Sequence, residues 1–213
     1  MRRSQIAVIG LILCFGTAFA GTNSWKVGPG KWEPPGNWSI GAPSLSDAAN
    51  LITNAGVRTV TIDQTTTNTP ATLTISNLVL DAFPPNTTNT LQLVNAGPLV
   101  PLHVLNALKI GSTTNGTLAQ LIITNSTLVY DGPGLSVDGR LTLDAGLILA
   151  PNSDLIVGDT PNGISNGTVV INNGTANFRH ILVARTDPSR GSLNIRGGTV
   201  TATNLIEIGR VHV

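Results

Sequence analysis

The sequence predicts an all-β parallel β-helix, a solenoid of stacked three-strand rungs, on the strength of composition and an internal repeat. Thr, Asn, Gly, Leu, Val and Ile dominate the 213 residues, and no segment has the i, i+3, i+4, i+7 apolar spacing of an amphipathic helix. Residues 192–209 read SLNIRGGTVTATNLIEIG, and 168–184 and 121–139 repeat the pattern of an alternating strand, an Asn/Gly turn and two further strands. Self-similarity at this period indicates a solenoid.

The repeat also predicts a rung of about 24 residues, because four isoleucines that end alternating strands are separated by multiples of that length. They are Ile75, Ile123, Ile171 and Ile195. Two residues after each comes a structural turn position, namely Asn77, Asn125, Asn173 or Gly197, the last followed by Gly198. Asn and Gly tolerate a positive φ, so we expect a left-handed turn there. An antiparallel sandwich would also have short strands, but it does not explain why Asn or Gly returns at this spacing.

Residues 1–20 are predicted to be a secretory signal peptide that is removed on maturation. Arg2 and Arg3 precede an apolar run, and Ala18-Phe19-Ala20 forms a small-x-small cleavage signature before Gly21. The alternative is an uncleaved anchor helix, for which the apolar run is short. After cleavage we expect no transmembrane segment in the mature chain.

Cleavage of the predicted signal peptide changes the cysteine content and the net charge of the chain. It removes the single cysteine and two of the 12 basic residues, so the charge falls close to zero against 11 acidic residues. No disulfide framework, thiolate metal site or nucleic-acid partner is then expected. Stability must come from packing and backbone hydrogen bonding.

Residues 21–56 differ from the rest of the chain and are predicted to form an N-terminal cap, with the rungs occupying 57–213. Trp25, Trp32 and Trp38 lie here among Gly and Pro. Their position directly before the first rung favours burial over the open end of the core. The alternative is a glycan-stacking platform that would make this segment a carbohydrate-binding module.

The segment GSLNIRGGTVTATNLIEIG at 191–209 resembles the repeats of bacterial exported proteins associated with autotransporters and with PEP-type C-terminal sorting signals. The opening 25–63 resembles the Trp-rich N-termini of such proteins, with matching residues Gly30, Trp32, Asn37, Trp38, Gly41, Pro43 and Asp47. The resemblance implies a right-handed β-helix exported to the cell surface or beyond, in the outer-membrane environment of a Gram-negative-type bacterium. It is specific for architecture and weak for function.

The chain ends at Val213, directly after the rung marker Glu207-Ile208-Gly209, with no recognisable cap. We therefore expect a fragment of a longer protein, whose missing C-terminal sequence would supply any surface attachment. The alternative is a short chain whose last residues close the solenoid themselves.

Carboxylates and histidines are the other candidates for chemistry. The aspartates of the middle rungs are Asp131, Asp138, Asp144, Asp154 and Asp159. Because they lie beside Gly, Pro or Asn, turn chemistry explains them better than acid–base catalysis or calcium binding. His103, His180 and His212 are far apart and lack metal-ligand spacing. No cofactor, metal or catalytic residue is predicted.

The sequence thus favours an exported structural or adhesive surface module that is not an enzyme. It would display polar ladders and loops such as 111–118 and 158–167, and its partners would be extracellular glycans or surface proteins. A polysaccharide lyase or hydrolase on the same fold is the alternative, and a carbohydrate-binding module that uses the tryptophans is a third.

Overall fold

The computed structural model describes residues 20–84, 86–112, 118–159, 165–186 and 188–209. Within these ranges the chain forms strands and three short 3-10 helices but no α-helix. The strands are β1 (Thr22–Ser24), β2 (Gly30–Lys31), β3 (Ala49–Ile52), β4 (Arg58–Asp63), β5 (Thr74–Leu80), β6 (Thr88–Ile110), β7 (Leu118–Tyr130), β8 (Gly134–Val137), β9 (Arg140–Val157), β10 (Asn166–Ile171), β11 (Thr175–Val183), β12 (Arg190–Ile195) and β13 (Thr199–Ile208). The 3-10 helices are η1 (Pro35–Asn37), η2 (Thr66–Asn68) and η3 (Pro70–Leu73).

These strands stack as a parallel β-helix with three faces. Face A contains β2, β4, β10 and β12 with the first segments of β6, β7 and β9. Face B contains the second segments of β6, β7 and β9 with the first segments of β11 and β13. Face C contains β1, β3 and β8 with the last segments of β5, β6, β9, β11 and β13.

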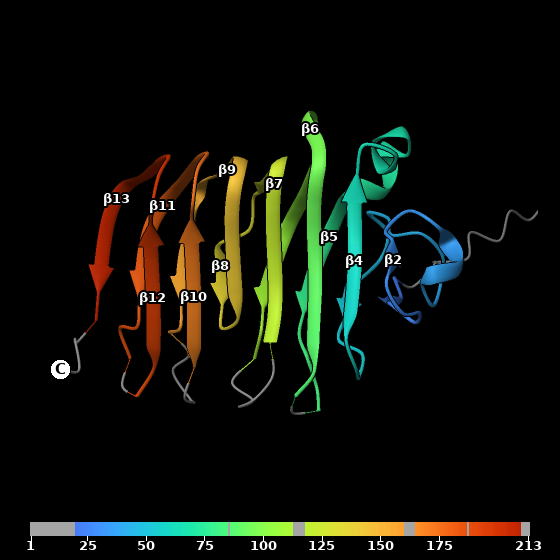
Figure 1. Ribbon diagram of the computed structural model, residues 1–213, viewed down its shortest axis with the longest axis horizontal. Coiled ribbons are helices and arrows are strands. Elements are labelled where there is room, and N and C mark those ends of the chain that lie inside the picture. Colours follow the sequence, from blue (N-terminus) through green and yellow to red (C-terminus); the bar gives the residue numbers. More distant parts are fainter. Residues whose placement is uncertain (1–19, 85, 113–117, 160–164, 187, 210–213) are drawn as a thin grey trace, which may run out of the picture.

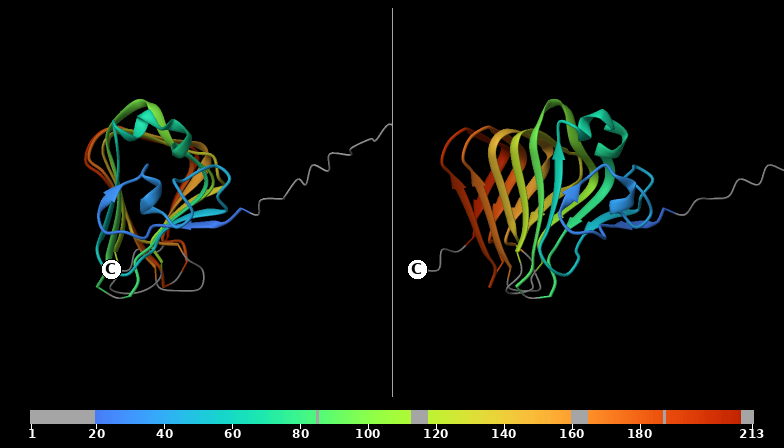
Figure 2. Two further views of the ribbon diagram at one scale, coloured as in Figure 1. Left: turned by 90° about the vertical axis from the view of Figure 1, so that its right-hand side faces the viewer. Right: turned by 45° about the vertical axis from the view of Figure 1, so that its right-hand side comes forward.

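All pairings between these strands are parallel, so the antiparallel sandwich is wrong and the solenoid is confirmed. The rungs follow one another along the long axis of the molecule (Figure 1), and the end-on view shows the chain winding around a central core (Figure 2). Each rung supplies the backbone partners of the next, which is how the described part of the chain satisfies its peptide groups without an α-helix.

The length of a rung varies, which corrects the predicted 24-residue register. Gln120 pairs with Arg140, only 20 residues on, whereas the step from β10 to β12 is the predicted 24 and the step from β4 to β6 is 31. Ile123, Leu143, Ile171 and Ile195 do form one column on face A. Ile75 does not belong to it, because it pairs with Val104, which in turn pairs with Tyr130 on face B. Links of unequal length account for the variation, both between faces A and B, as after β4, and between faces C and A, as between β8 and β9.

The turn from face A to face B uses the predicted left-handed backbone, but often at a neighbouring residue. Positive φ values occur at Asn95 (53°), Asn125 (47°), Gly146 (112°), Gly174 (99°) and Gly198 (79°). Asn125 and Gly198 are therefore confirmed as turn positions.

Asn77 is not a turn position, whereas Asn173 and Gly197 lie in their predicted turns with the left-handed residue one place further on. Asn173 and Gly197 directly precede the residues with positive φ. Asn77 lies within β5, where its side-chain amide donates to the Ala48 carbonyl at 2.6 Å. Its strand belongs to face C, because the chain after β4 reaches β5 through η2 and η3 rather than through the tight turn.

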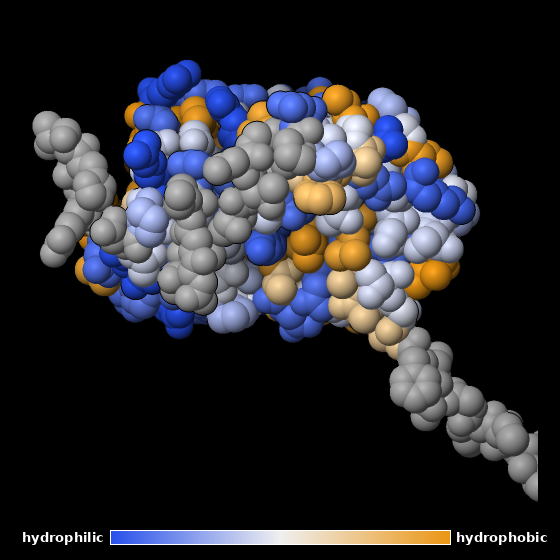
Figure 3. All heavy atoms as spheres, turned by 90° about the horizontal axis from the view of Figure 1, so that it is seen from below, coloured by the Kyte–Doolittle hydropathy of each residue, from blue (hydrophilic) through white to orange (hydrophobic). Residues whose placement is uncertain are grey.

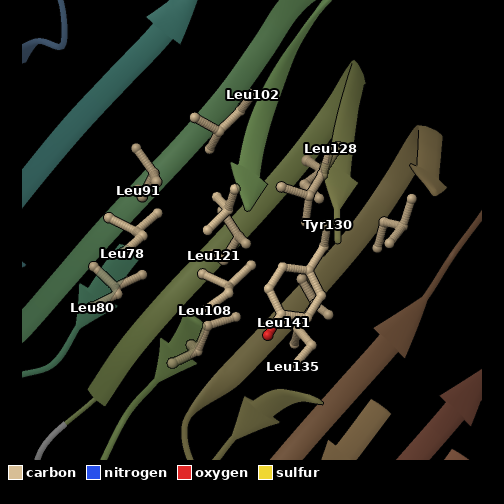
Figure 4. Close-up of a cluster of buried hydrophobic side chains, with 14 of the residues drawn as sticks. Leu78, Leu80, Leu91, Leu102, Leu108, Leu121, Leu128, Tyr130, Leu135 and Leu141 are labelled. Carbon is tan, nitrogen blue, oxygen red and sulfur yellow. The ribbon is translucent and has the colours of Figure 1, made fainter. Parts of the chain in front are cut away.

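The core consists of columns of identical or similar side chains that repeat from rung to rung. Leu91, Leu121 and Leu141 are in register on face A, and each is fully buried. Leu78, Leu108 and Leu135 form the equivalent column on face C. Figure 4 shows both sets pointing into the same interior, together with Leu102, Leu128 and Tyr130. Because each column stacks leucine on leucine, neighbouring rungs fill the core to the same depth and their strands remain paired.

The N-terminal segment closes one end of this core. Trp25, Trp32 and Trp38 are at most 1% exposed. Trp38 contacts the other two indoles edge to face, with centroid distances of 5.2 Å to Trp25 and 5.0 Å to Trp32. The boundary predicted at residue 56 is not a structural break, because β1 and β3 already stack in parallel on β5.

The opposite end of the described solenoid leaves core positions open. β12 and β13 are the outermost strands, and Ile195, Ile206 and Ile208 are 53%, 57% and 67% exposed although they continue the interior columns. Residues 210–213, on which the expectation of a missing cap depends, lie outside the described residues.

Candidate functional site

The tryptophans, the first candidate site from the sequence, do not present an aromatic surface. Their indole nitrogens donate to the carbonyls of Gly28, Thr72 and Trp32 at 3.0, 2.9 and 2.7 Å. A stacking platform needs an exposed ring face, and all three rings are buried against one another and the first rungs. The three rings therefore form the cap and present no exposed face for stacking.

Two of the aspartates lie where face B turns into face C. The Asp131 carboxylate is 2.6 Å from Nε2 of His103, one rung away. Asp154 Oδ1 accepts hydrogen bonds from Nε of Arg179 and lies 2.8 Å from Nδ1 of His180. Each carboxylate is thus held by the preceding or following rung.

The remaining aspartates occupy other corners of the solenoid. Asp144, between faces A and B, accepts a hydrogen bond of 2.6 Å from the amide of Asn172. Asp138 and Asp159 lie between faces C and A, and both are buried. The two carboxylates of a glycosidase must flank one bond within about 10 Å. Within this set Asp131 and Asp154 share a corner, but each is held by a hydrogen bond to a side chain of a neighbouring rung.

The ion pairs of Asp154 and Asp159 also lower the pKa of these carboxyls. For Asp154 the largest cause is the hydrogen bond from Arg179, which outweighs partial burial. Burial alone would raise the pKa of Asp159, but hydrogen bonds from Thr186 and Arg185 reverse the effect. Both groups are therefore ionised at neutral pH, as a structural ion pair requires and a general acid does not.

No cluster of three or more His, Asp, Glu or Cys side chains suited to a metal ion occurs among the described residues. His103 and His180 contact separate aspartates, and His212 lies outside the described part of the chain. The described residues likewise include no helix long and apolar enough to cross a membrane.

The outward side chains of face A form a largely polar surface, interrupted by Ile122 and Val170, which we call the polar face. Buried residues alternate with outward ones along each strand, so the outward set follows from the core register. Most of its members are hydroxyl or amide side chains: Thr59, Thr61, Asp63, Thr90, Gln92, Gln120, Thr124, Arg140, Thr142, Asp144, Thr168, Asn172, Ser192 and Asn194.

Several hydrogen bonds cross between rungs on or beside the polar face. Gln92 Nε2 donates to Thr61 Oγ1 at 2.8 Å, and Ser192 Oγ donates to Thr168 Oγ1 at 3.3 Å. At the adjoining corner Asn125 donates to Asn95 at 3.0 Å. The adjoining corner between faces C and A, viewed from below in Figure 3, mixes hydrophilic and hydrophobic residues in its described part.

The polar face is hollowed at its N-terminal end by a cavity of about 370 Å³, which we call the β4–β6 pocket. Its lining is Thr61, Asp63, Gln64, Thr65, Gln92, Val94 and Asn95. The hollow forms because the chain after β4 runs into η2 and η3, whereas the next rung turns tightly at Asn95. The pocket thus lies at the corner where the chain leaves the regular path of the rungs through η2 and η3.

Sequence reasoning did not identify these pocket residues. Thr61 and Gln92 are 31 residues apart, and a constant 24-residue repeat does not align them. The available signal was the stretch 64–73, which is rich in Thr and contains Pro70 but has no alternating pattern. That stretch marks an excursion from the solenoid.

The fold and these surfaces define a capped parallel β-helix with a polar lateral face. No protein-family model, curated protein or solved structure matches the chain. The arguments below therefore rest on the geometry of the described residues.

Proposed function

We propose that the protein is an exported structural and adhesive module that acts through its lateral surface and not through a catalytic centre. The observation that carries this proposal is the contrast between its carboxylates and its polar face. Asp131, Asp144 and Asp154 are each engaged by a side chain of a neighbouring rung, whereas the polar face offers outward hydroxyl and amide groups on most rungs.

A rigid array of this kind suits adhesion because its groups are already ordered before a partner arrives. The backbone of each rung is fixed by two neighbours, so little conformational entropy is lost on binding. Export rests on the signal sequence predicted at 1–20, which lies almost wholly outside the described residues. The display loops predicted at 111–118 and 158–167 also fall largely outside them.

The test is a binding screen of the mature chain against glycans, extracellular matrix proteins and cell surfaces, run beside an assay for depolymerisation of the same glycans. The proposal expects saturable binding without product formation. Turnover of a polysaccharide that is abolished by Asp131→Ala or Asp154→Ala would instead establish the enzyme alternative. The absence of binding to every member of the screen would refute the adhesive part.

A further inference from the structure

We propose that the β4–β6 pocket is a binding site for a short stretch of neutral, hydroxyl-rich glycan. This inference rests on the proposed adhesive function for its setting and adds the site and the ligand class. The volume of about 370 Å³ lies at the lower end of the range of about 300–1,000 Å³ for small-molecule sites. It suits a short chain segment better than a large ligand.

The pocket has fixed walls. Its floor is formed by two adjacent parallel strands, with Thr61 paired to Gln92 and Asp63 paired to Val94. One wall is the start of the η2 excursion, where Asp63 Oδ1 accepts hydrogen bonds from the Thr65 backbone amide at 2.9 Å and hydroxyl at 2.7 Å. A pre-formed hollow of this kind binds without a folding cost.

Amide groups supply its spare hydrogen-bonding capacity. Within the described residues, the Gln64 side chain makes no hydrogen bond, and Gln92 uses only its nitrogen, so its carbonyl oxygen is available. Asn95 accepts a hydrogen bond from Asn125 through its oxygen and keeps its own amide hydrogens for a ligand. Amides both donate and accept, as sugar hydroxyls do, so each can bind a pair of adjacent hydroxyls.

The charge of the pocket excludes other ligand classes. Asp63 is the only ionisable residue of the lining, and Lys31 from the preceding rung forms an ion pair with its second oxygen. With both oxygens engaged, the carboxylate is not a cation site. No cationic side chain lines the pocket to neutralise a uronate, sulfate or phosphate, and Lys31 is already paired with Asp63, so an acidic glycan would find no counter-charge there.

An apolar strip completes the match to a sugar. Val94 lines the pocket between the amides, and its methyl groups can contact the C–H face of a pyranose while the hydroxyls meet Gln64, Gln92 and Asn95. No buried aromatic ring takes part, so affinity depends on a few hydrogen bonds and is expected to be modest.

The test measures binding of neutral cello-, malto-, manno- and xylo-oligosaccharides to the mature chain by titration calorimetry. The double variant Gln64→Ala/Gln92→Ala removes amide groups from the pocket. Asn194→Ala is the matched control, because it removes an exposed amide from the same face several rungs away. Far-UV circular dichroism checks that both variants keep their strands.

We expect at least one neutral oligosaccharide to bind, the double variant to lose about tenfold or more in affinity and the control to retain it. Equal binding by the double variant would overturn the pocket assignment while leaving the adhesive function intact. Binding of acidic glycans or proteins alone would overturn the ligand class but not the proposed function. If nothing in either screen binds, both proposals fail.

Discussion

Replacing Trp38 by Ala tests whether the tryptophan cluster is the structural end of the solenoid. The indole is 1% exposed, touches both other tryptophans edge to face and donates to the Trp32 carbonyl. Truncating a buried Trp to Ala costs about 3–5 kcal/mol, which includes the lost ring contacts. The unpaired carbonyl of Trp32 moves the expected loss in the free energy of unfolding toward the upper part of that range.

The measurement is urea unfolding followed by far-UV circular dichroism. With a slope of about 2 kcal/mol per molar urea, a loss of about 4 kcal/mol lowers the midpoint by about 2 M. Ile40→Ala is the matched control, since this large side chain lies two residues away and is 57% exposed. A surface change of this kind shifts stability by no more than about 0.5 kcal/mol.

If Trp38→Ala unfolds at the same urea concentration as Ile40→Ala, the cap does not stabilise the rungs and the reasoning is refuted. Trp38→Phe is an intermediate case, because the ring is retained but the hydrogen bond is lost. It should lie between the wild type and the Ala variant.

Three further predictions concern the turns, the ion pairs and export. Gly146→Ala forces a β-carbon into a left-handed turn against the backbone of the neighbouring rung, and should cost about 2 kcal/mol or more in a thermal melt, unlike Gly36→Ala, which meets open space. Asp154 and Asp159 have lowered pKa values in the folded state, so their stabilisation is present above about pH 4 and is lost as the pH falls through the folded pKa. Urea midpoints measured from pH 7 to pH 2 should fall in that window, and Asp154→Asn should flatten the fall. Mass spectrometry of protein exported by a bacterial host should find a mature N-terminus at Gly21, whereas a retained leader would contradict the signal-peptide prediction.

The fold class could be predicted from the sequence because alternation and Asn/Gly turns are local features. The register could not, since the links between faces C and A and those between faces A and B both differ in length from rung to rung. The separation of Ile123 from Ile171 equals two predicted rungs only because the rungs between them are 20 and 28 residues long. A mean period therefore placed some residues correctly and put Ile75 on the wrong face.

The turn residues show how local steric rules limit such a prediction. Asn173 satisfies the composition rule for a left-handed turn, yet Gly174 adopts the positive φ. With two permissive residues in succession, the packing of the rung decides which one bends. The β4–β6 pocket was missed for a related reason, because it joins residues from separate rungs and an irregular excursion.

Because all three tryptophans lie in the cap, they are an intrinsic fluorescent probe of one end of the solenoid. Intrinsic tryptophan fluorescence reports only on residues 25–38, whereas far-UV dichroism reports on every rung. The single tyrosine, Tyr130, is buried in the middle of the stack, so its signal reports on the central rungs. Comparing these signals along one denaturation curve would reveal the direction in which the solenoid comes apart, without any added probe.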